Sequence, residues 1–183
     1  NGKPTAMYPI NTHFTAPRLP SSGIPWMVPK SDFFESGNLN PEWQFYGYTP
    51  ANLFSLTERP GWLRLSPKTR RFNLLSKNDG EHNYSLITRV DFEPQSPQDE
   101  AGLVIMRGDE KMFVKLVSTV NALGRRIIRF SFNDDYYQAD NLAGSIVWLK
   151  LVRVNHIIMA YYSKDGTSWT PFERTFDISA IDS

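Results

Sequence analysis

Residues 83–94 read NYSLITRVDFEP, and their side chains alternate between two faces. One face carries Tyr84, Leu86, Thr88, Val90 and Phe92, and the other carries Ser85, Ile87, Arg89 and Asp91. Successive side chains of a β-strand point to opposite faces of its sheet, so a period of two indicates a half-buried strand. The stretch therefore predicts a strand that packs one face on a core.

Short runs rich in β-branched and aromatic residues follow this strand at intervals of roughly ten residues, separated by turn formers. The further strands that we expect are 103–106, 112–117, 126–133, 145–154, 157–163 and 169–172. Between the last two stands KDGT at 164–167, where Asp-Gly supplies the positive φ that a tight hairpin prefers. No strong amphipathic helix pattern appears, so we predict an all-β, antiparallel β-sandwich.

Length and composition indicate one folded domain. The chain has 183 residues, of which 40% are apolar and 14% aromatic, enough for one substantial core. Residues 1–30 contain six prolines, at positions 4, 9, 17, 20, 25 and 29, which disfavour both helix and central strand. We therefore expect an extended, proline-rich leader or linker at 1–30 and the β-sandwich at 31–183.

Charge and cysteine content exclude several classes of function. The formal net charge of +1 provides no basic field for a phosphate backbone, so no nucleic-acid partner is expected. The chain has no cysteine, which excludes disulfides, thiolate metal sites and a cysteine nucleophile. No apolar run is long enough to cross a bilayer, so no membrane partner is expected. The compartment stays open, with a secreted or periplasmic location favoured over a cytoplasmic one.

Six segments carry a resemblance to a known family. They are DFFESGNL at 32–39, WQF at 43–45, SLTERPGWLRL at 55–65, RVDFEP at 89–94, AGLV at 101–104 and YYSKDGTSWTP at 161–171. In this order they resemble the C-terminal domain of family 43 β-xylosidases. The resemblance implies a concanavalin A-like jelly roll, attached to a five-bladed catalytic propeller in a β-xylosidase or α-L-arabinofuranosidase that degrades xylan or arabinoxylan.

The resemblance also implies that this chain is not itself the catalyst. In the family the catalytic carboxylates belong to the propeller, and the closing strands of the sandwich follow the segment that matches 177–179, so we expect the last strands to be missing. The glutamates support the same view, because Glu93, Glu100 and Glu110 are isolated in predicted loops. A retaining glycosidase needs two carboxylates about 5 Å apart.

Candidate carbohydrate-binding residues combine aromatic and polar side chains, because sugar rings stack on aromatic faces and sugar hydroxyls bind amide, carboxylate and guanidinium groups. The candidates are Gln44, Tyr46, Tyr48, Arg107, Tyr136 and Tyr137. The first three would share the outer face of a strand, Arg107 interrupts an apolar run, and the last two lie in a predicted turn at 133–138. Alternatively, the tyrosines cover the sandwich or contact the propeller, one of Tyr136 and Tyr137 is buried, and Arg107 forms a salt bridge.

Two further assignments concern metal and core. The resemblance allows Asp32 as a ligand of a structural Ca²⁺, and no other cofactor is expected. Trp148 and Trp169 stand in apolar contexts and are assigned to the core.

Three functions remain open at this stage. The preferred one is an accessory domain that docks on the catalytic propeller and shapes its active site. The alternatives are an autonomous module that binds a xylan-type polysaccharide or oligosaccharide, which is compatible with the first and is also favoured by the resemblance, and a sandwich used only for protein contact.

Overall fold

The computed structural model describes residues 31–46, 53–66, 73–78, 81–106 and 113–179. The chain divides into two compact units, residues 1–78 (the first unit) and 79–183 (the second unit). The predicted leader, 1–30, lies outside the described residues, so its boundary at residue 30 stays a prediction. None of the described segments forms a helix that is long and apolar enough to cross a membrane.

The described part of the first unit contains two short antiparallel ladders. Strand β1 (Gln44–Tyr46) pairs with β4 (Leu74–Ser76), and β2 (Phe54–Ser55) pairs with β3 (Arg64–Leu65). The rings of Phe45 and Phe54 lie 5.1 Å apart between centroids and join the two ladders through an aromatic contact.

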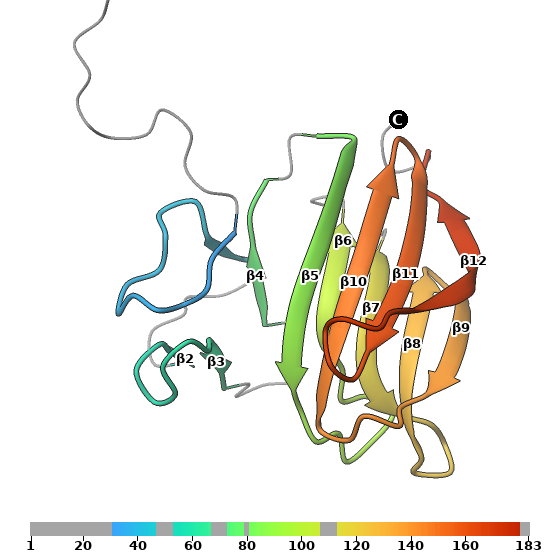
Figure 1. The fold of residues 1–183 in the computed structure, drawn as a ribbon, viewed down its shortest axis with the longest axis horizontal. Helices are drawn as coiled ribbons and strands as arrows, with labels where there is room; N and C mark the ends of the chain where they lie inside the picture. Colours follow the sequence, from blue (N-terminus) through green and yellow to red (C-terminus); the bar gives the residue numbers. More distant parts are fainter. Residues whose placement is uncertain (1–30, 47–52, 67–72, 79–80, 107–112, 180–183) are drawn as a thin grey trace, which may run out of the picture. The chain divides into compact units, whose positions relative to one another are not determined.

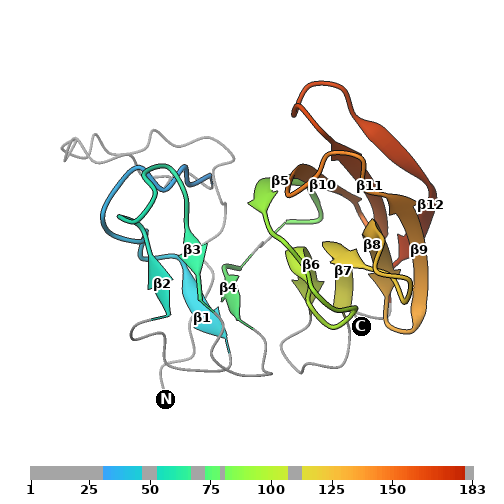
Figure 2. The same cartoon turned by 90° about the horizontal axis from the view of Figure 1, so that it is seen from below.

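The second unit is a sandwich of two four-stranded antiparallel sheets, as predicted. One sheet has the order β12-β11-β10-β5 and the other the order β6-β7-β8-β9. Figure 1 shows the strands of this unit, and Figure 2, turned by 90°, shows the two sheets as separate layers. The strand bounds are β5 Asn83–Asp91, β6 Ala101–Met106, β7 Phe113–Val120, β8 Arg126–Phe132, β9 Asp135–Asp140, β10 Ile146–Val154, β11 Ile157–Ser163 and β12 Thr170–Asp177.

The core of the second unit lies between these sheets. Both layers contribute buried apolar side chains: Ile105, Val114, Leu116, Ile128 and Phe130 from one, and Val147, Leu149, Leu151, Ile158, Ala160 and Phe176 from the other. Tyr84, Leu86 and Val90 of β5 pack against this core, which confirms the alternation read from the sequence. Since about 25 cal/mol is gained per Å² of apolar surface buried, the interior face of each strand is the main source of stability.

Residues 133–138 are not the turn that the sequence suggested. Asn133, with φ 52°, and Asp134 form the connection, and Asp135–Asp140 continue as β9. Phe132 pairs with Asp135, so the chain reverses its direction within two residues. From there β9 pairs with β8 without a register shift as far as Ile127 and Asp140. The polar composition of β9 made it resemble a loop in the sequence. This composition fits the last strand in the order of its sheet, because polar and charged side chains there discourage pairing with another chain.

The assignment of Trp148 and Trp169 to the core was wrong. Val147 and Leu149 are fully buried in the core, so Trp148 points to the opposite, outer face of β10. There Lys150 lies with its Nζ 4.4 Å from the ring centroid of Trp169, and Arg89 lies over Trp148. Strand β10 pairs on both sides, and Arg89 and Lys150 lie over aromatic rings on its outer face, so large apolar groups occur on both of its faces.

Candidate functional site

The outer face of the sheet β6-β7-β8-β9 carries a concentration of polar side chains. Because Leu116 and Phe130 point into the core, the residues that alternate with them point away from it: Lys115, Val117 and Thr119 from β7, and Arg129 and Ser131 from β8. Val117, Thr119 and Ser131 are nevertheless buried. The register places Gln138 of β9 beside Arg129, and Tyr136 beside Ser131. This pairing brings an aromatic ring, an amide and a guanidinium together on one surface.

A cleft of about 350 Å³ opens on this face. Its lining consists of Pro97, Asn121, Ala122, Leu123, Arg129, Tyr136 and Gln138. The floor comes from β8 and β9, and the walls come from the β5–β6 connection and the β7–β8 turn.

Both walls are fixed by side chains that bind their own backbone. In the β7–β8 turn, Asn121 Oδ1 accepts hydrogen bonds from the N–H groups of Leu123 and Arg125, at 2.9 and 3.0 Å. In the β5–β6 connection, Asp99 Oδ2 accepts from the N–H groups of Gln95 and Ser96, each at 2.9 Å. The N–H of Gln95 and, to a lesser extent, the contacts from Ser96 lower the pKa of Asp99 below its ordinary value, against an opposing effect of desolvation, so this carboxylate keeps its charge and its bonds to a lower pH than an ordinary aspartate would.

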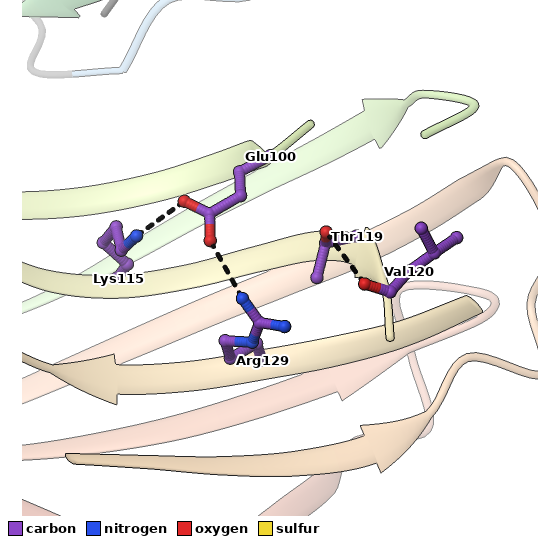
Figure 3. Close-up of polar contacts among 5 residues, drawn as sticks. All are labelled: Glu100, Lys115, Thr119, Val120 and Arg129. Atoms are coloured by element: carbon purple, nitrogen blue, oxygen red, sulfur yellow. Dashed lines mark hydrogen bonds and ion pairs between the residues drawn. The ribbon is translucent and has the colours of Figure 1, made fainter. Parts of the chain in front are cut away.

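A charged network lies beside the cleft (Figure 3). Oε2 of Glu100 lies 2.6 Å from Nζ of Lys115, and Oε1 lies 3.3 Å from Nη1 of Arg129. The three side chains are mostly buried, so solvent screens these pairs less than it screens a surface salt bridge. Both oxygens of Glu100 contact cations, which suits it to hold Arg129 in place and not to transfer a proton.

Tyr136 presents an exposed ring at the cleft. The side chain is among the exposed large apolar groups, at 59% relative exposure, and Cζ of Arg129 lies 5.6 Å from its ring centroid. A guanidinium over an aromatic ring is a weakly attractive cation–π contact that also orients the ring. The exposed ring, with the amide of Gln138 and the guanidinium of Arg129 nearby, has the composition of a site that stacks and hydrogen-bonds a sugar.

Two hydrogen-bond donors of β8 are buried without a partner, Nε of Arg129 and Oγ of Ser131. Ser131 is 4% exposed, so its hydroxyl is withdrawn from bulk water. An unsatisfied buried polar group costs about 1–3 kcal/mol. This face therefore contains two hydrogen-bond donors that lack an acceptor.

The structure separates the residues predicted to bind sugar. Gln44, exposed, and Tyr46, half-buried, lie on β1 in the first unit. Tyr136 lines the cleft, while Tyr137, next to it on β9, points to the other face and packs its ring 5.5 Å from that of Phe176. Tyr48 and Arg107 lie outside the described residues.

Sequence reasoning missed Arg129, Gln138, Glu100 and Lys115. Arg129 interrupts the apolar run RIIRFSF at 126–132, which is the same signal that singled out Arg107. Gln138 alternates with Tyr136 once 135–140 is recognised as a strand. Glu100 and Lys115 could not be found in this way, because their proximity depends on how β6 and β7 pair.

Asp32, the predicted calcium ligand, is engaged within the protein. Its Oδ1 accepts from the N–H of Phe34 at 2.8 Å, and its Oδ2 accepts from Nε1 of Trp43 at 3.0 Å. Among the residues that the structure describes, no group of three histidine or acidic side chains could hold a metal ion. Calcium binding at Asp32 stays a prediction.

Comparison with known proteins gives a consistent set of similarities. Residues 31–183 match the family model described as the β-xylosidase C-terminal concanavalin A-like domain. A non-reducing end α-L-arabinofuranosidase of Bacteroides ovatus is 30% identical over 132 residues, which cover 68% of this chain and 25% of that enzyme. A xylan 1,3-β-xylosidase of a Vibrio species is 30% identical over 127 residues, which cover 63% of this chain and 23% of the relative.

Among solved structures, the xylan β-1,4-xylosidase of Bacillus halodurans C-125 superposes with a TM-score of 0.75 at 24% identity, over 91% of this chain and 34% of that one. This likeness supports the fold. The chain thus spans about a quarter of the length of these two curated relatives and about a third of this solved chain.

Proposed function

Because this chain belongs to the family of β-xylosidase C-terminal concanavalin A-like domains, we propose that it is a non-catalytic accessory domain of a glycoside hydrolase that degrades xylan or arabinoxylan. We also propose that it binds a xylan-type chain in the cleft of the second unit. The observation that carries this proposal is the exposed ring of Tyr136 beside Arg129 and Gln138.

The chemistry of the cleft suits a short stretch of sugar. A pyranose presents an apolar C–H face, which stacks on the ring of Tyr136, and equatorial hydroxyls, which bind the amide of Gln138 and the guanidinium of Arg129. A volume of about 350 Å³ is at the small end of the ~300–1,000 Å³ of most ligand sites. The cleft therefore accommodates one or two rings of a polysaccharide, whose remainder lies over the surface.

Calorimetric titration of the chain with xylo-oligosaccharides and arabinoxylan tests the proposal. Tyr136→Ala should weaken binding about fivefold or more, because it removes the stacking surface. Leu142→Ala is the matched control, since Leu142 is 92% exposed, does not line the cleft, and its replacement should leave the affinity unchanged. A folded chain that binds none of these sugars would contradict the binding function.

A second candidate function is docking on a five-bladed catalytic propeller, whose active site this domain would then shape. The outer face of the other sheet supports it, because basic and aromatic side chains alternate there and Ile87 is 54% exposed. In this view Ile87→Asp should weaken association with a separately produced propeller domain of the parent enzyme, as measured by gel filtration. If the association survives Ile87→Asp, the docking surface lies elsewhere on the domain. If the chain has neither sugar affinity nor a hydrolase partner, protein contact of another kind is the remaining function.

A further inference from the structure

Arg129 is the one charged side chain among the described residues that line the cleft. Arg129 and Lys115 share one carboxylate, that of Glu100. The other cleft-lining side chains are neutral: Pro97, Asn121, Ala122, Leu123, Tyr136 and Gln138. Two other carboxylates belong to elements that line the cleft: Asp140 follows Gln138 by two residues on β9, and Asp99 of the β5–β6 connection accepts the backbone N–H groups of Gln95 and Ser96 with one oxygen.

Glu100 makes a shorter contact with Lys115 than with Arg129. Its 2.6 Å contact with Lys115 is as short as strong charge-assisted hydrogen bonds become, while its 3.3 Å contact with Arg129 is longer than the ~2.7–2.9 Å typical of such bonds. Arg129 is therefore the cation that is less well neutralised, and it is the one that lines the cleft.

The orphaned donors lie on the same strand face. Nε of Arg129 and the hydroxyl of Ser131, two residues further along β8, are both buried without an acceptor. A carboxylate offers only acceptors, about four lone-pair sites, and binds a guanidinium through two parallel hydrogen bonds. A neutral hydroxyl brings no charge and supplies a donor where donors are already in excess.

From these observations we infer that the cleft recognises a hexuronic acid substituent of the polysaccharide, whose carboxylate binds the guanidinium of Arg129 while its ring stacks on Tyr136. This inference rests on the proposed sugar-binding function and names the class of sugar. The carboxylate would bind the guanidinium from the cleft that Arg129 lines. Nε of Arg129 is buried, so the side chain has to turn before Nε can donate to the second carboxylate oxygen.

Three ligands separate this inference from the broader function. They are a xylo-oligosaccharide that carries one glucuronic acid, the same oligosaccharide with its carboxyl group reduced to the alcohol, and the unsubstituted xylo-oligosaccharide. Calorimetry with the full chain should give about tenfold or more tighter binding for the acidic ligand than for its reduced form, because a hydrogen bond between charged groups is worth more than a neutral one. This preference should fall as salt is raised.

Two variants assign the preference to Arg129. Arg129→Gln should abolish the difference between the acidic and reduced ligands while weak binding of the neutral chain remains. Arg126→Gln is the matched control, because Arg126 is a neighbouring arginine of β8 that pairs with Glu93 and does not line the cleft, and the preference should persist. Circular dichroism of each variant shows whether it is folded.

Equal affinity for the acidic and reduced ligands would overturn the uronic acid assignment and leave the sugar-binding function intact. A preference for the acid that survives Arg129→Gln in a folded variant would also overturn it. Absence of binding for all three ligands would overturn both proposals.

Discussion

The indole of Trp148 packs on Gly166, so that a Cβ at position 166 would lie 2.9 Å from Cε2 of the ring. The Asp-Gly turn by itself accounts for a glycine here through its positive φ, and φ is indeed 77°. The structure adds a second reason, because the turn between β11 and β12 folds over the outer face of β10. A glycine is thus required both by the backbone and by the ring beneath it.

Gly166→Ala should destabilise the second unit by about 2–5 kcal/mol, because the left-handed backbone costs ~1–2 kcal/mol and the clash with Trp148 adds about 1–3 kcal/mol. Gly124→Ala isolates the first effect, since Gly124 has φ 73° and a Cβ added there would meet nothing within 4 Å, and it should cost only about 1–2 kcal/mol. Urea unfolding measures both. Equal losses for the two variants would show that the indole moves aside freely.

Glu100→Ala should destabilise the fold by about 1–3 kcal/mol, because it leaves two mostly buried cations, Lys115 and Arg129, without their shared carboxylate. Glu93→Ala is the matched control: its partner Arg126 lies 3.4 Å away and the pair is more exposed, so the loss should stay below about 0.5 kcal/mol. Chemical unfolding of both variants in low salt makes the comparison. If Glu93 proved as important as Glu100, burial would not be what makes the network strong.

Stability should depend on pH through Asp165. The backbone N–H groups of Ser168 and Thr167, in that order, and the hydroxyl of Ser163 hold the pKa of this carboxyl far below its ordinary value of 3.8. A folded-state pKa that is lowered gives stability that is fully present above the unfolded pKa and is lost as the pH falls toward the folded one. The second unit should therefore lose stability below about pH 4.

Asp165→Asn tests this dependence, because asparagine keeps the shape of the side chain and removes its charge. The variant should be less stable than the natural chain at pH 7, and the difference should shrink as the pH is lowered from 4 toward 2, as measured by unfolding at each pH. A difference that stays constant across this range would mean that the charge of Asp165 is not what the turn uses.

The sequence predicted more of the fold than of the site, for a physical reason. Period-two alternation in 83–91 and the Asp-Gly turn at 165–166 are local signals, and both were confirmed. The error at 133–138 was also local in origin: a polar strand at the end of a sheet has the composition of a loop, and only its register with β8 distinguishes the two. Trp148 was misplaced because a strand covered on both faces hides which face is the core.

The site depends on pairings between strands that are distant in sequence. Glu100, Lys115 and Arg129 are brought together by the ladders β6–β7 and β7–β8, and no spacing in the chain reports that contact. Tyr136 could be found because an exposed tyrosine next to a turn is suggestive in any context. Its neighbour Tyr137 is also a tyrosine next to that turn, but successive side chains of β9 point to opposite faces of the sheet, so Tyr137 does not share the outer face with Tyr136.

That separation gives the last prediction. Tyr137 pairs with Phe130 across β8 and β9, and its ring packs on Phe176, which lies 4.6 Å from the ring of Phe130. Tyr137→Ala should therefore cost about 1–3 kcal/mol of stability, because it removes a partly buried ring from an aromatic cluster. Tyr136→Ala, on the outer face, should change stability by less than about 1 kcal/mol and affect sugar affinity instead. Urea unfolding together with sugar titration of both variants tests the division, and a Tyr136→Ala variant less stable than Tyr137→Ala would show that the outer ring supports the sheet and is not held for a ligand.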